Sequence, residues 1–351
     1  MSENIVDKKK KVTLLDIANR VGVTKGLVSL ALSDSDLVNE NTRAEIILAA
    51  LEMGYDLKKR KISQTRTKVF SLVGRESSRL NHFFWAEVIK GMEIELAERG
   101  FSLDLIIFKD TDDKDEVLLE LVNKKTQGII VVADCDRKRI GSLGKSGLPI
   151  VVVDGNNYYG TGYDCVNASN YISAYSAARY LIKKGHRSIA FVGNTELAIS
   201  FKQRAAGFRD GARIADVNVV YNECTGKGTN KQQYFDERKL AAVLSKEERP
   251  TAIMCTNDFT ACEVYDFLKK RNLSVPEDIS LIGFDNINFD HELIDRLTTF
   301  DVPKKEMGKL AVELLEERLE RPEGAKKIVE VMAGMIERTS VIDLSDKRNK
   351  L

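Results

Sequence analysis

Polar side chains that could hold a small molecule follow two apolar runs typical of buried strands. Asn257 and Asp258 close the first run, residues 252–258, and Asp285 closes the second, residues 279–285. Ligands of parallel sheets bind at the carboxyl ends of the strands, so these groups are candidates for ligand contacts. Each carboxylate could instead cap the helix that follows, and Asp258 is well placed to do so.

Three consecutive aromatic residues, Phe83, Phe84 and Trp85, follow the first strand-like run of the body of the chain. Aromatic faces suit the apolar side of a sugar or base ring in a binding cleft. Aromatic residues also fill cores, which is the alternative for one or two of the three. We expect Phe83 and Phe84 to contact a ligand.

Basic residues are concentrated near the N-terminus, although the whole chain carries a net charge of only +1. Residues 1–68 contain 13 Lys and Arg against 9 Asp and Glu. The excess lies in Lys8–Lys11 and in Lys58–Lys61 with Arg66 and Lys68. Such runs are often solvated tails, but these two flank a helical segment. Contact with DNA phosphates is therefore the interpretation we prefer, and it implies an affinity that falls steeply with salt.

The segment between the two basic clusters has the pattern of three short helices. The predicted helices cover residues 14–21, 25–32 and 40–53, with Thr13, Thr24 and Asn39 as their N-cap candidates. Gly22 ends the first helix, because glycine takes the left-handed conformation without strain. Two helices joined by so tight a turn form a helix-turn-helix, whose second helix enters the DNA major groove.

From Val69 onward, strand-like apolar runs alternate with helical patterns. Continuous Val and Ile runs are typical of parallel strands that are covered on both faces. The strand candidates are residues 69–74, 103–108, 128–134, 149–155, 188–194, 252–258 and 279–285. The helical runs between them include residues 85–99, 172–184, 260–271 and 305–319. This alternation predicts an α/β architecture.

Head and body together resemble the lactose-repressor (LacI/GalR) family of bacterial regulators. The matching strings of the head are VTLLDIA (12–18), VGVT (21–24), VS (28–29), VNENTR (38–43) and MGY (53–55). Those of the body include KKGHRSIAFVG (183–193), RAAGF (204–208), CTND (255–258), VPEDISLIGFDN (275–286) and LTTF (297–300). Their order and spacing carry the resemblance over most of the chain.

The resemblance implies an N-terminal all-α helix-turn-helix head joined to an α/β effector domain of two subdomains, similar to periplasmic binding proteins. The head is expected at residues 1–55 and a basic hinge or linker at 56–68. The expected effector subdomains are 69–167 with 301–325 for the N-subdomain, and 168–298 with 326–342 for the C-subdomain, followed by a tail at 343–351.

The resemblance also implies which residues of the head and linker contact DNA. We expect these contacts at Thr13, Thr24, Lys25, Gly26, Ser29, Leu30, Asn39, Lys58, Lys59, Arg60 and Ile62. Leu30 stands where the family commonly has an arginine, and leucine cannot make arginine's bidentate pair with guanine. The linker lacks the family's wedge-forming leucine, which leaves Ile62 as the only apolar candidate for the minor groove. The operator should therefore differ from the family's common one.

In the effector domain, the resemblance implies a ligand cleft lined by Phe83, Phe84, Asn170, Arg204, Asn257 and Asp285. Arg204 is the arginine of the R-x-x-G-F pattern, and its guanidinium offers five fixed donors. The alternative for Arg204 is an ordinary position on a helix surface. Ser169 replaces an acid that the family often has before Asn170, so one ligand contact common in the family is altered or missing.

We therefore expect a ligand-responsive transcriptional regulator, most simply a repressor. Its expected partners are a near-palindromic double-stranded DNA operator, a small-molecule effector (a sugar or sugar derivative) and a second copy of the chain in a homodimer. The alternatives are a cytosolic solute-binding sensor without DNA regulation, a solute-binding protein for transport, and a cytosolic enzyme.

Several missing features argue against the alternatives. The sequence has no apolar run long enough to span a membrane and no secretory signal at its start. Its five cysteines have no metal-type spacing and suit a reducing cytoplasm. It has no P-loop, no dinucleotide fingerprint and no nucleophile elbow. We expect no membrane partner, no catalytic residue, no metal and no cofactor, in a bacterial cytoplasmic protein associated with the nucleoid.

Overall fold

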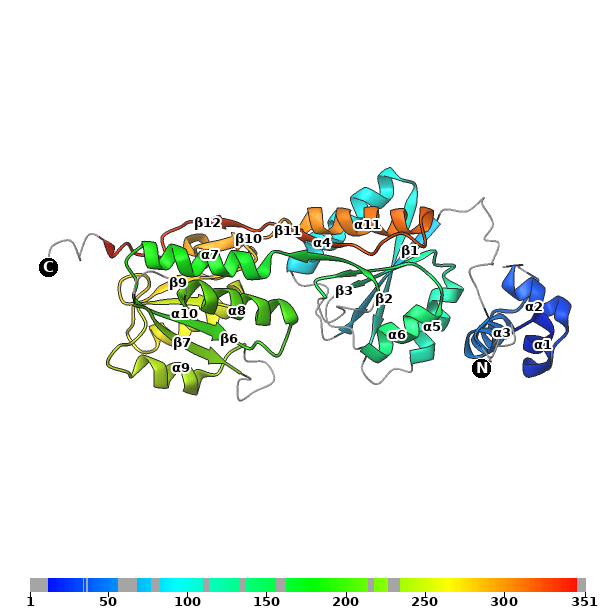
Figure 1. The fold of residues 1–351 in the computed structure, drawn as a ribbon, viewed down its shortest axis with the longest axis horizontal. Helices are drawn as coiled ribbons and strands as arrows, with labels where there is room; N and C mark the ends of the chain where they lie inside the picture. The colour runs from blue at the N-terminus through cyan, green and yellow to red at the C-terminus, as the bar shows by residue number, and fades with distance from the viewer. Residues whose placement is uncertain are drawn as a thin grey trace, which may run out of the picture.

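The computed structural model describes most of the chain and separates it into a small helical head and a larger α/β body (Figure 1). The described residues are 12–33, 35, 37–55, 68–76, 83–109, 114–132, 137–155, 162–213, 218–226 and 234–345. Four of the expected DNA contacts, Lys58, Lys59, Arg60 and Ile62, lie outside these residues, as do both basic clusters apart from Lys68.

The head consists of α1 (Leu14–Val21), α2 (Lys25–Leu32) and α3 (Glu40–Glu52), as the sequence predicts. Its N-caps are the expected ones: the side chains of Thr13, Thr24 and Asn39 each accept a backbone N–H of the following helix. Gly22 takes the left-handed conformation, with φ of 77°, and ends α1. The head has its own core of fully buried side chains, made by Ile17, Val28, Ala31, Ile46 and Ile47.

The first subdomain is built on a six-stranded sheet in the order β11-β5-β4-β3-β1-β2, and every pair in it is parallel. Its strands are β1 (Lys68–Arg75), β2 (Phe101–Phe108), β3 (Gly128–Val132), β4 (Ile150–Val153), β5 (Asp164–Ala168) and β11 (Ile328–Val331). Its helices are α4 (Phe83–Glu98), α5 (Lys114–Asn123), α6 (Arg137–Lys145) and α11 (Lys304–Glu320). Helices α4 and α11 cover one face of the sheet, and α5 and α6 cover the other (Figure 1).

Helices α4 and α11 pack at very close range. A Cβ atom added at Gly91 would collide with the backbone of Lys305, and one at Gly308 with the carbonyl oxygen of Val88. The two helices therefore touch backbone to backbone at positions where only glycine fits.

The second subdomain has a four-stranded parallel sheet in the order β7-β6-β8-β9. Its strands are β6 (Ser188–Gly193), β7 (Val220–Thr225), β8 (Ala252–Cys255) and β9 (Ser280–Ile282), and its helices are α7 (Asn170–Lys183), α8 (Ile199–Arg213), α9 (Glu237–Leu244) and α10 (Asp258–Lys269). A short 3-10 helix, η4 (Ile294–Arg296), precedes β10 (Thr299–Asp301), which pairs antiparallel with β12 (Gly334–Ile336).

The chain passes between the two subdomains three times: from β5 to α7, from β10 to α11 and from β11 to β12. Ser169 ties the first crossing to the third. Its N–H donates to the carbonyl of Val331 at 2.9 Å, and its hydroxyl accepts the N–H of Ala333 at 3.0 Å. Because β11 pairs with β5 in the first sheet, we propose that the last subdomain boundary falls after Val331 and not at residue 326.

The predicted architecture of a helix-turn-helix head followed by an α/β domain is confirmed. All seven expected strands are present, and five further strands, β5, β7, β10, β11 and β12, complete the sheets and crossings. No helix among the described residues has the length and apolar character needed to cross a membrane.

Candidate functional site

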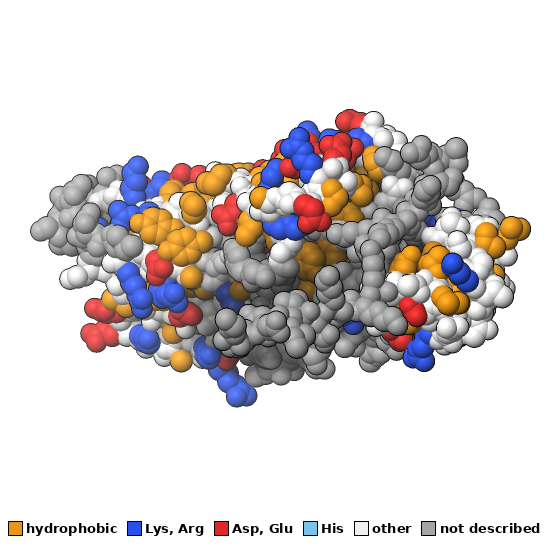
Figure 2. Space-filling view, turned by 45° about the vertical axis from the view of Figure 1, so that its right-hand side comes forward, with side chains coloured by type: hydrophobic (Ala, Val, Ile, Leu, Met, Phe, Trp, Pro, Cys, Tyr) orange, Lys and Arg blue, Asp and Glu red, His pale blue; other side chains and the backbone are white. Residues whose placement is uncertain are grey.

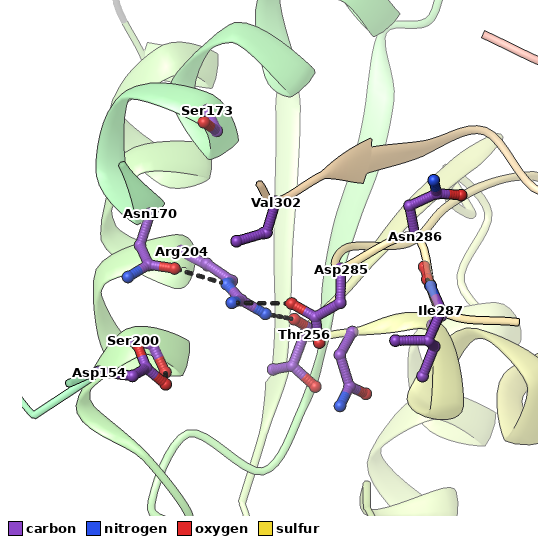
Figure 3. Close-up of polar contacts among 12 residues, drawn as sticks. Asp154, Asn170, Ser173, Ser200, Arg204, Thr256, Asp285, Asn286, Ile287 and Val302 are labelled. Atoms are coloured by element: carbon purple, nitrogen blue, oxygen red, sulfur yellow. Dashed lines mark hydrogen bonds and ion pairs between the residues drawn. The ribbon is translucent and has the colours of Figure 1, made fainter. Parts of the chain in front are cut away.

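The guanidinium of Arg204, on α8, lies at the centre of a buried polar cluster (Figure 3). Its Nε donates to Oδ1 of Asn170 at 2.9 Å, and its Nη1 donates to the carbonyl oxygen of Thr256 at 2.6 Å. Its Nη2 donates to Oδ1 of Asp285 at 3.1 Å. Arg204 is only 3% exposed, so these contacts replace water around its charge. The alternative of a surface arginine is therefore wrong.

Two aromatic rings lie against this guanidinium, one of them at short distance. The Cζ atom of Arg204 lies 3.7 Å from the ring centre of Phe284 and 5.4 Å from that of Phe201. A cation over an aromatic face is attracted by the ring quadrupole, and planar stacking also fixes the orientation of the guanidinium. Hydrogen bonds thus hold the guanidinium of Arg204 within its plane, and the aromatic contacts hold it in the perpendicular direction.

Asp285 is the carboxylate that neutralises Arg204. Burial raises the pKa of Asp285, and the charges of Arg204 and Lys304 oppose that rise. Lys304 contacts the same residue from the other subdomain: its Nζ donates to the carbonyl oxygen of Asp285 at 2.5 Å. Since Lys304 begins α11, the cluster around Arg204 is linked directly to a helix of the first subdomain.

A second buried carboxylate, Asp258, lies near the first. Its Oδ2 accepts the N–H of Ile287 at 2.9 Å, and its Oδ1 accepts the hydroxyl of Thr299 at 2.6 Å. Burial, with a further contribution from Asp285, raises the pKa of Asp258 to about 7. Asp258 is the first residue of α10 but does not cap it.

The cap of α10 is Asn257, whose Oδ1 accepts both the N–H and the hydroxyl of Thr260, at 3.0 and 2.8 Å. The expectation that Asp258 could be the cap is therefore wrong. The amide oxygen of Asn257 is occupied by its own helix, so its side-chain NH₂ is the part suited to donate to a ligand.

The two subdomains meet next to this cluster. The hydroxyl of Ser200 on α8 donates to Oδ2 of Asp154 at 3.4 Å, and Asp154 directly follows β4 of the first sheet (Figure 3). Asp154 has a φ of 54°, a left-handed conformation that is uncommon for a residue other than glycine. Neither Ser200 nor Asp154 belongs to a sequence pattern that points to a site.

A cluster of aromatic rings also joins the subdomains. Phe83, at the start of α4, is 50% exposed and stacks with Phe259 and Phe289 of the second subdomain, with centroid distances of 6.5 and 6.1 Å. Phe259 and Phe289 stack on each other at 4.4 Å, and Tyr234 adds a fourth ring. The four rings come from distant parts of the sequence, so no local pattern could have identified this cluster.

The structure thus brings together Asn170, Arg204 and Asp285 but separates the roles of the two expected aromatic contacts. Phe83 presents an exposed ring to other rings, whereas Phe84 is buried and packs edge-on against Trp85 in the core. We regard Phe84 as a core residue. The cluster around Arg204 offers hydrogen-bond donors and acceptors of both charges, which suits binding of a polar molecule. Within the described part of the chain, no group of His, Cys, Asp or Glu could hold a metal.

The head presents a second candidate site on the outer face of α2. Lys25, Gly26, Ser29 and Leu30 are exposed on this face, and the opposite face packs into the core of the head. Figure 2 shows that apolar as well as charged side chains reach the surface of the head. The hydroxyl of Thr24 accepts the N–H of Leu27 at 3.2 Å. This capping bond keeps the Thr24 side chain at the N-terminus of α2.

The chain is similar in sequence to known regulators over nearly its whole length. Residues 13–56 match the family described as bacterial regulatory proteins, lacI family, and residues 178–341 match a periplasmic binding protein-like domain. The HTH-type transcriptional repressor PurR of Vibrio campbellii is 30% identical over 342 residues, 95% of this chain and 99% of that protein. PurR of Pectobacterium atrosepticum is 28% identical over 336 residues, 94% and 97% of the two chains.

Solved structures share the fold. The transcriptional regulator CelR–cellobiose complex has a TM-score of 0.69 at 22% identity and covers 94% of this chain and 100% of its own. The lac repressor dimer bound to operator and the anti-inducer ONPF has a TM-score of 0.65 at 19% identity and covers 95% and 100%.

Proposed function

This chain belongs to the lacI family of bacterial regulatory proteins, and from that premise we propose that it is a ligand-responsive transcriptional repressor. The observation that carries the proposal is the exposed face of α2 in a complete three-helix head. Its Lys25, Ser29 and Leu30 side chains are free for the edges of base pairs, because the packing residues of α2 all lie on its other face. The PurR relatives are named as repressors, which supports the sign of the regulation.

We further propose that the molecule acts as a homodimer on a near-palindromic operator. Three apolar side chains of the first subdomain support a partner surface: Ile94 on α4, and Leu105 and Ile107 on β2, which are 49%, 46% and 50% exposed. Strand β2 is an edge of its sheet, and exposed apolar groups beside such an edge mark interaction sites. The related lac repressor structure is a dimer on its operator. Two-fold symmetric heads read two symmetric half-sites.

The proposed effector is a small polar metabolite, a sugar or sugar derivative, bound between the subdomains. Asn170, Arg204 and Asp285 supply groups for hydroxyls, and the ring of Phe83 with its aromatic partners supplies a face for a pyranose or furanose ring. The related CelR structure is a complex with cellobiose, which supports this ligand class.

Effector and operator would be coupled through the crossings between the subdomains. Lys304 holds the carbonyl oxygen of Asp285 and begins α11, so a ligand that moves Asp285 also moves a helix of the first subdomain. Coupling of this kind is a free-energy difference between two states, and ligand and DNA exert it on each other equally. A protein bound to operator DNA works in the bacterial cytoplasm, at the nucleoid.

The test combines selection of operator DNA with a screen for the effector. In vitro selection with the full chain should return duplexes with two-fold symmetry. A thermal-shift screen of sugars, sugar phosphates, purine bases and nucleosides should then identify a stabilising compound. Adding that compound to the labelled duplex gives the sign of the coupling.

Arg204→Lys should abolish the thermal shift, because lysine lacks the fixed donor fork. Arg318→Lys is the matched control: Arg318 makes a similarly buried pair with Asp164, at 2.9 and 3.0 Å, at the other end of β5 from the cluster. This control variant should keep the response. Chemical turnover of the compound, or selection without a preferred sequence, would reject the proposed function.

A further inference from the structure

The outer face of α2 has an unusual composition for a surface that contacts DNA. Val28, Ala31 and Leu32 are buried in the head, at 0%, 0% and 7% exposure, which fixes the rotation of α2. The opposite face then presents Lys25, Gly26, Ser29 and Leu30. Lysine is the only charged group on it, and Leu30 is the only apolar side chain of α2 that is exposed, at 38%.

Leu30 has open space on the side toward which its side chain leans. Side chains of a helix point toward its N-terminus, over the residue four positions earlier. For Leu30 that residue is Gly26, where an added Cβ would meet nothing nearer than Oγ1 of Thr24 at 3.9 Å. Gly26 and the short Ser29 therefore let the helix surface approach base edges closely, with Leu30 as the group that projects.

The chemistry of Leu30 limits what it can recognise. Its side chain has no donor or acceptor, so it cannot replace the water bound to a polar base edge. The major groove carries one apolar group, the 5-methyl group of thymine. Contact with this methyl group removes apolar surface of both partners from water, whereas contact with any other base edge leaves polar atoms unsatisfied.

We propose that Leu30 reads the 5-methyl group of a thymine in each operator half-site. The proposal rests on the proposed function, since it requires α2 to lie in the major groove, and it names one base pair that the head selects. The operator then carries a T·A pair at the position that Leu30 contacts. A polar residue in place of Leu30 would instead select a base there by hydrogen bonds.

The experiment removes the methyl group alone. Each thymine of a selected operator is replaced by deoxyuridine, symmetrically in both half-sites, and affinity is measured by fluorescence anisotropy with the full chain. One position should lose affinity about fourfold per half-site, the change expected for one methyl-sized group returned to water. Leu30→Ala should bind the thymine and uracil duplexes equally at that position. The matched variant Leu37→Ala removes an exposed leucine of the head outside α2 and should keep the difference.

Leu30→Arg provides a second variant with a gain of function, because arginine pairs with guanine. It should shift the preferred base at the same position from thymine to guanine in a repeated selection. Circular dichroism of each variant verifies that the exposed substitution leaves the head folded.

Failure of the reading by Leu30 and failure of the proposed function give different results. If specific duplexes are selected but no thymine responds to loss of its methyl group, the reading by Leu30 is wrong and the proposed function stands. If Leu30→Ala keeps the full thymine–uracil difference, another residue reads the methyl group. If no duplex is selected at all, the proposed function fails, and the reading of thymine by Leu30 fails with it.

Discussion

At the scale of single residues, the buried polar cluster around Arg204 is defined by two carboxylates with different partners. Asp285 is paired with Arg204, whereas the hydrogen-bond donors to Asp258 among the described residues are neutral: the N–H of Ile287 and the hydroxyl of Thr299. A carboxylate without a paired cation is more costly to ionise in the interior, which is why the pKa of Asp258 rises to about 7.

Asp258 should therefore make the protein less stable as the pH rises. Its pKa in the folded state lies above its ordinary value, so the folded state binds the proton more tightly than the unfolded state. The stabilisation is fully present below the ordinary pKa and is lost as the pH rises through about 7. The charge of Asp285 favours the protonated form of Asp258, and the charge of the nearby Lys304 opposes it.

Asp258→Asn removes the titration and keeps an acceptor oxygen for Ile287 or Thr299. Urea unfolding at several values between about pH 5 and pH 8 should give a free energy of unfolding that falls with pH in the wild type and falls less in the variant. The exposed Asp290→Asn is the control and should follow the wild type. Parallel curves for the wild type and Asp258→Asn would contradict the assignment.

Residue types predicted part of this site and missed the rest for a physical reason. Asp285 closes a strand-like run, and Arg204 belongs to the R-x-x-G-F pattern, so local sequence identifies both. Ser200 and Asp154 have no such pattern, because their pairing depends on how two separate sheets meet. Phe84 is the converse case: the sequence suggests a ligand contact, whereas in the structure the ring packs against Trp85 in the core.

At the scale of elements, the contact of α4 with α11 should be the least tolerant packing contact of the first subdomain. Gly308→Ala would drive a methyl group into the carbonyl of Val88, so we expect a loss of about 1–3 kcal/mol, typical of overpacking. Gly141→Ala on α6 is the matched control, because its Cβ would meet nothing within 4 Å.

The control should be neutral or stabilising by up to about 1 kcal/mol, the difference in helix propensity between alanine and glycine. Thermal unfolding of both variants measures the contrast. Equal melting temperatures would mean that α4 and α11 separate readily and that their glycines are incidental.

The elements themselves were predictable in proportion to their length and apolar content. Seven strands with apolar runs were expected close to where they lie. Strands β10 and β12 have three residues each, and β11 is largely exposed, so none has an apolar run of its own. They exist because neighbouring strands pair with them at the crossings, which is information that local sequence does not contain.

At the scale of the whole molecule, charge is distributed unevenly and predicts a strong effect of salt on DNA binding. The net charge is only +1, yet the segment up to residue 68 holds 13 basic against 9 acidic residues. Raising the salt from about 50 to about 200 mM should lower operator affinity by about a thousandfold or more, if about six or more phosphates are neutralised.

Fluorescence anisotropy over this range measures the slope. Replacing Lys58, Lys59 and Arg60 by Gln should reduce the slope by about one unit for each residue that contacts a phosphate, without changing the preferred sequence. A slope that stays unchanged would exclude the linker from phosphate contact.

The pairing of β11 with β5 also determines the order in which the protein can be completed during its synthesis. Domains fold as they leave the ribosome, the N-terminal ones first. The head and the second sheet have all their strands and helices once Ile282 has emerged, but the first sheet lacks an edge strand until Val331 emerges. A chain that stops between Ile282 and Val331 would carry a folded head and a folded second sheet, but its first sheet would be incomplete. Such a product could still occupy DNA but could not respond to a signal.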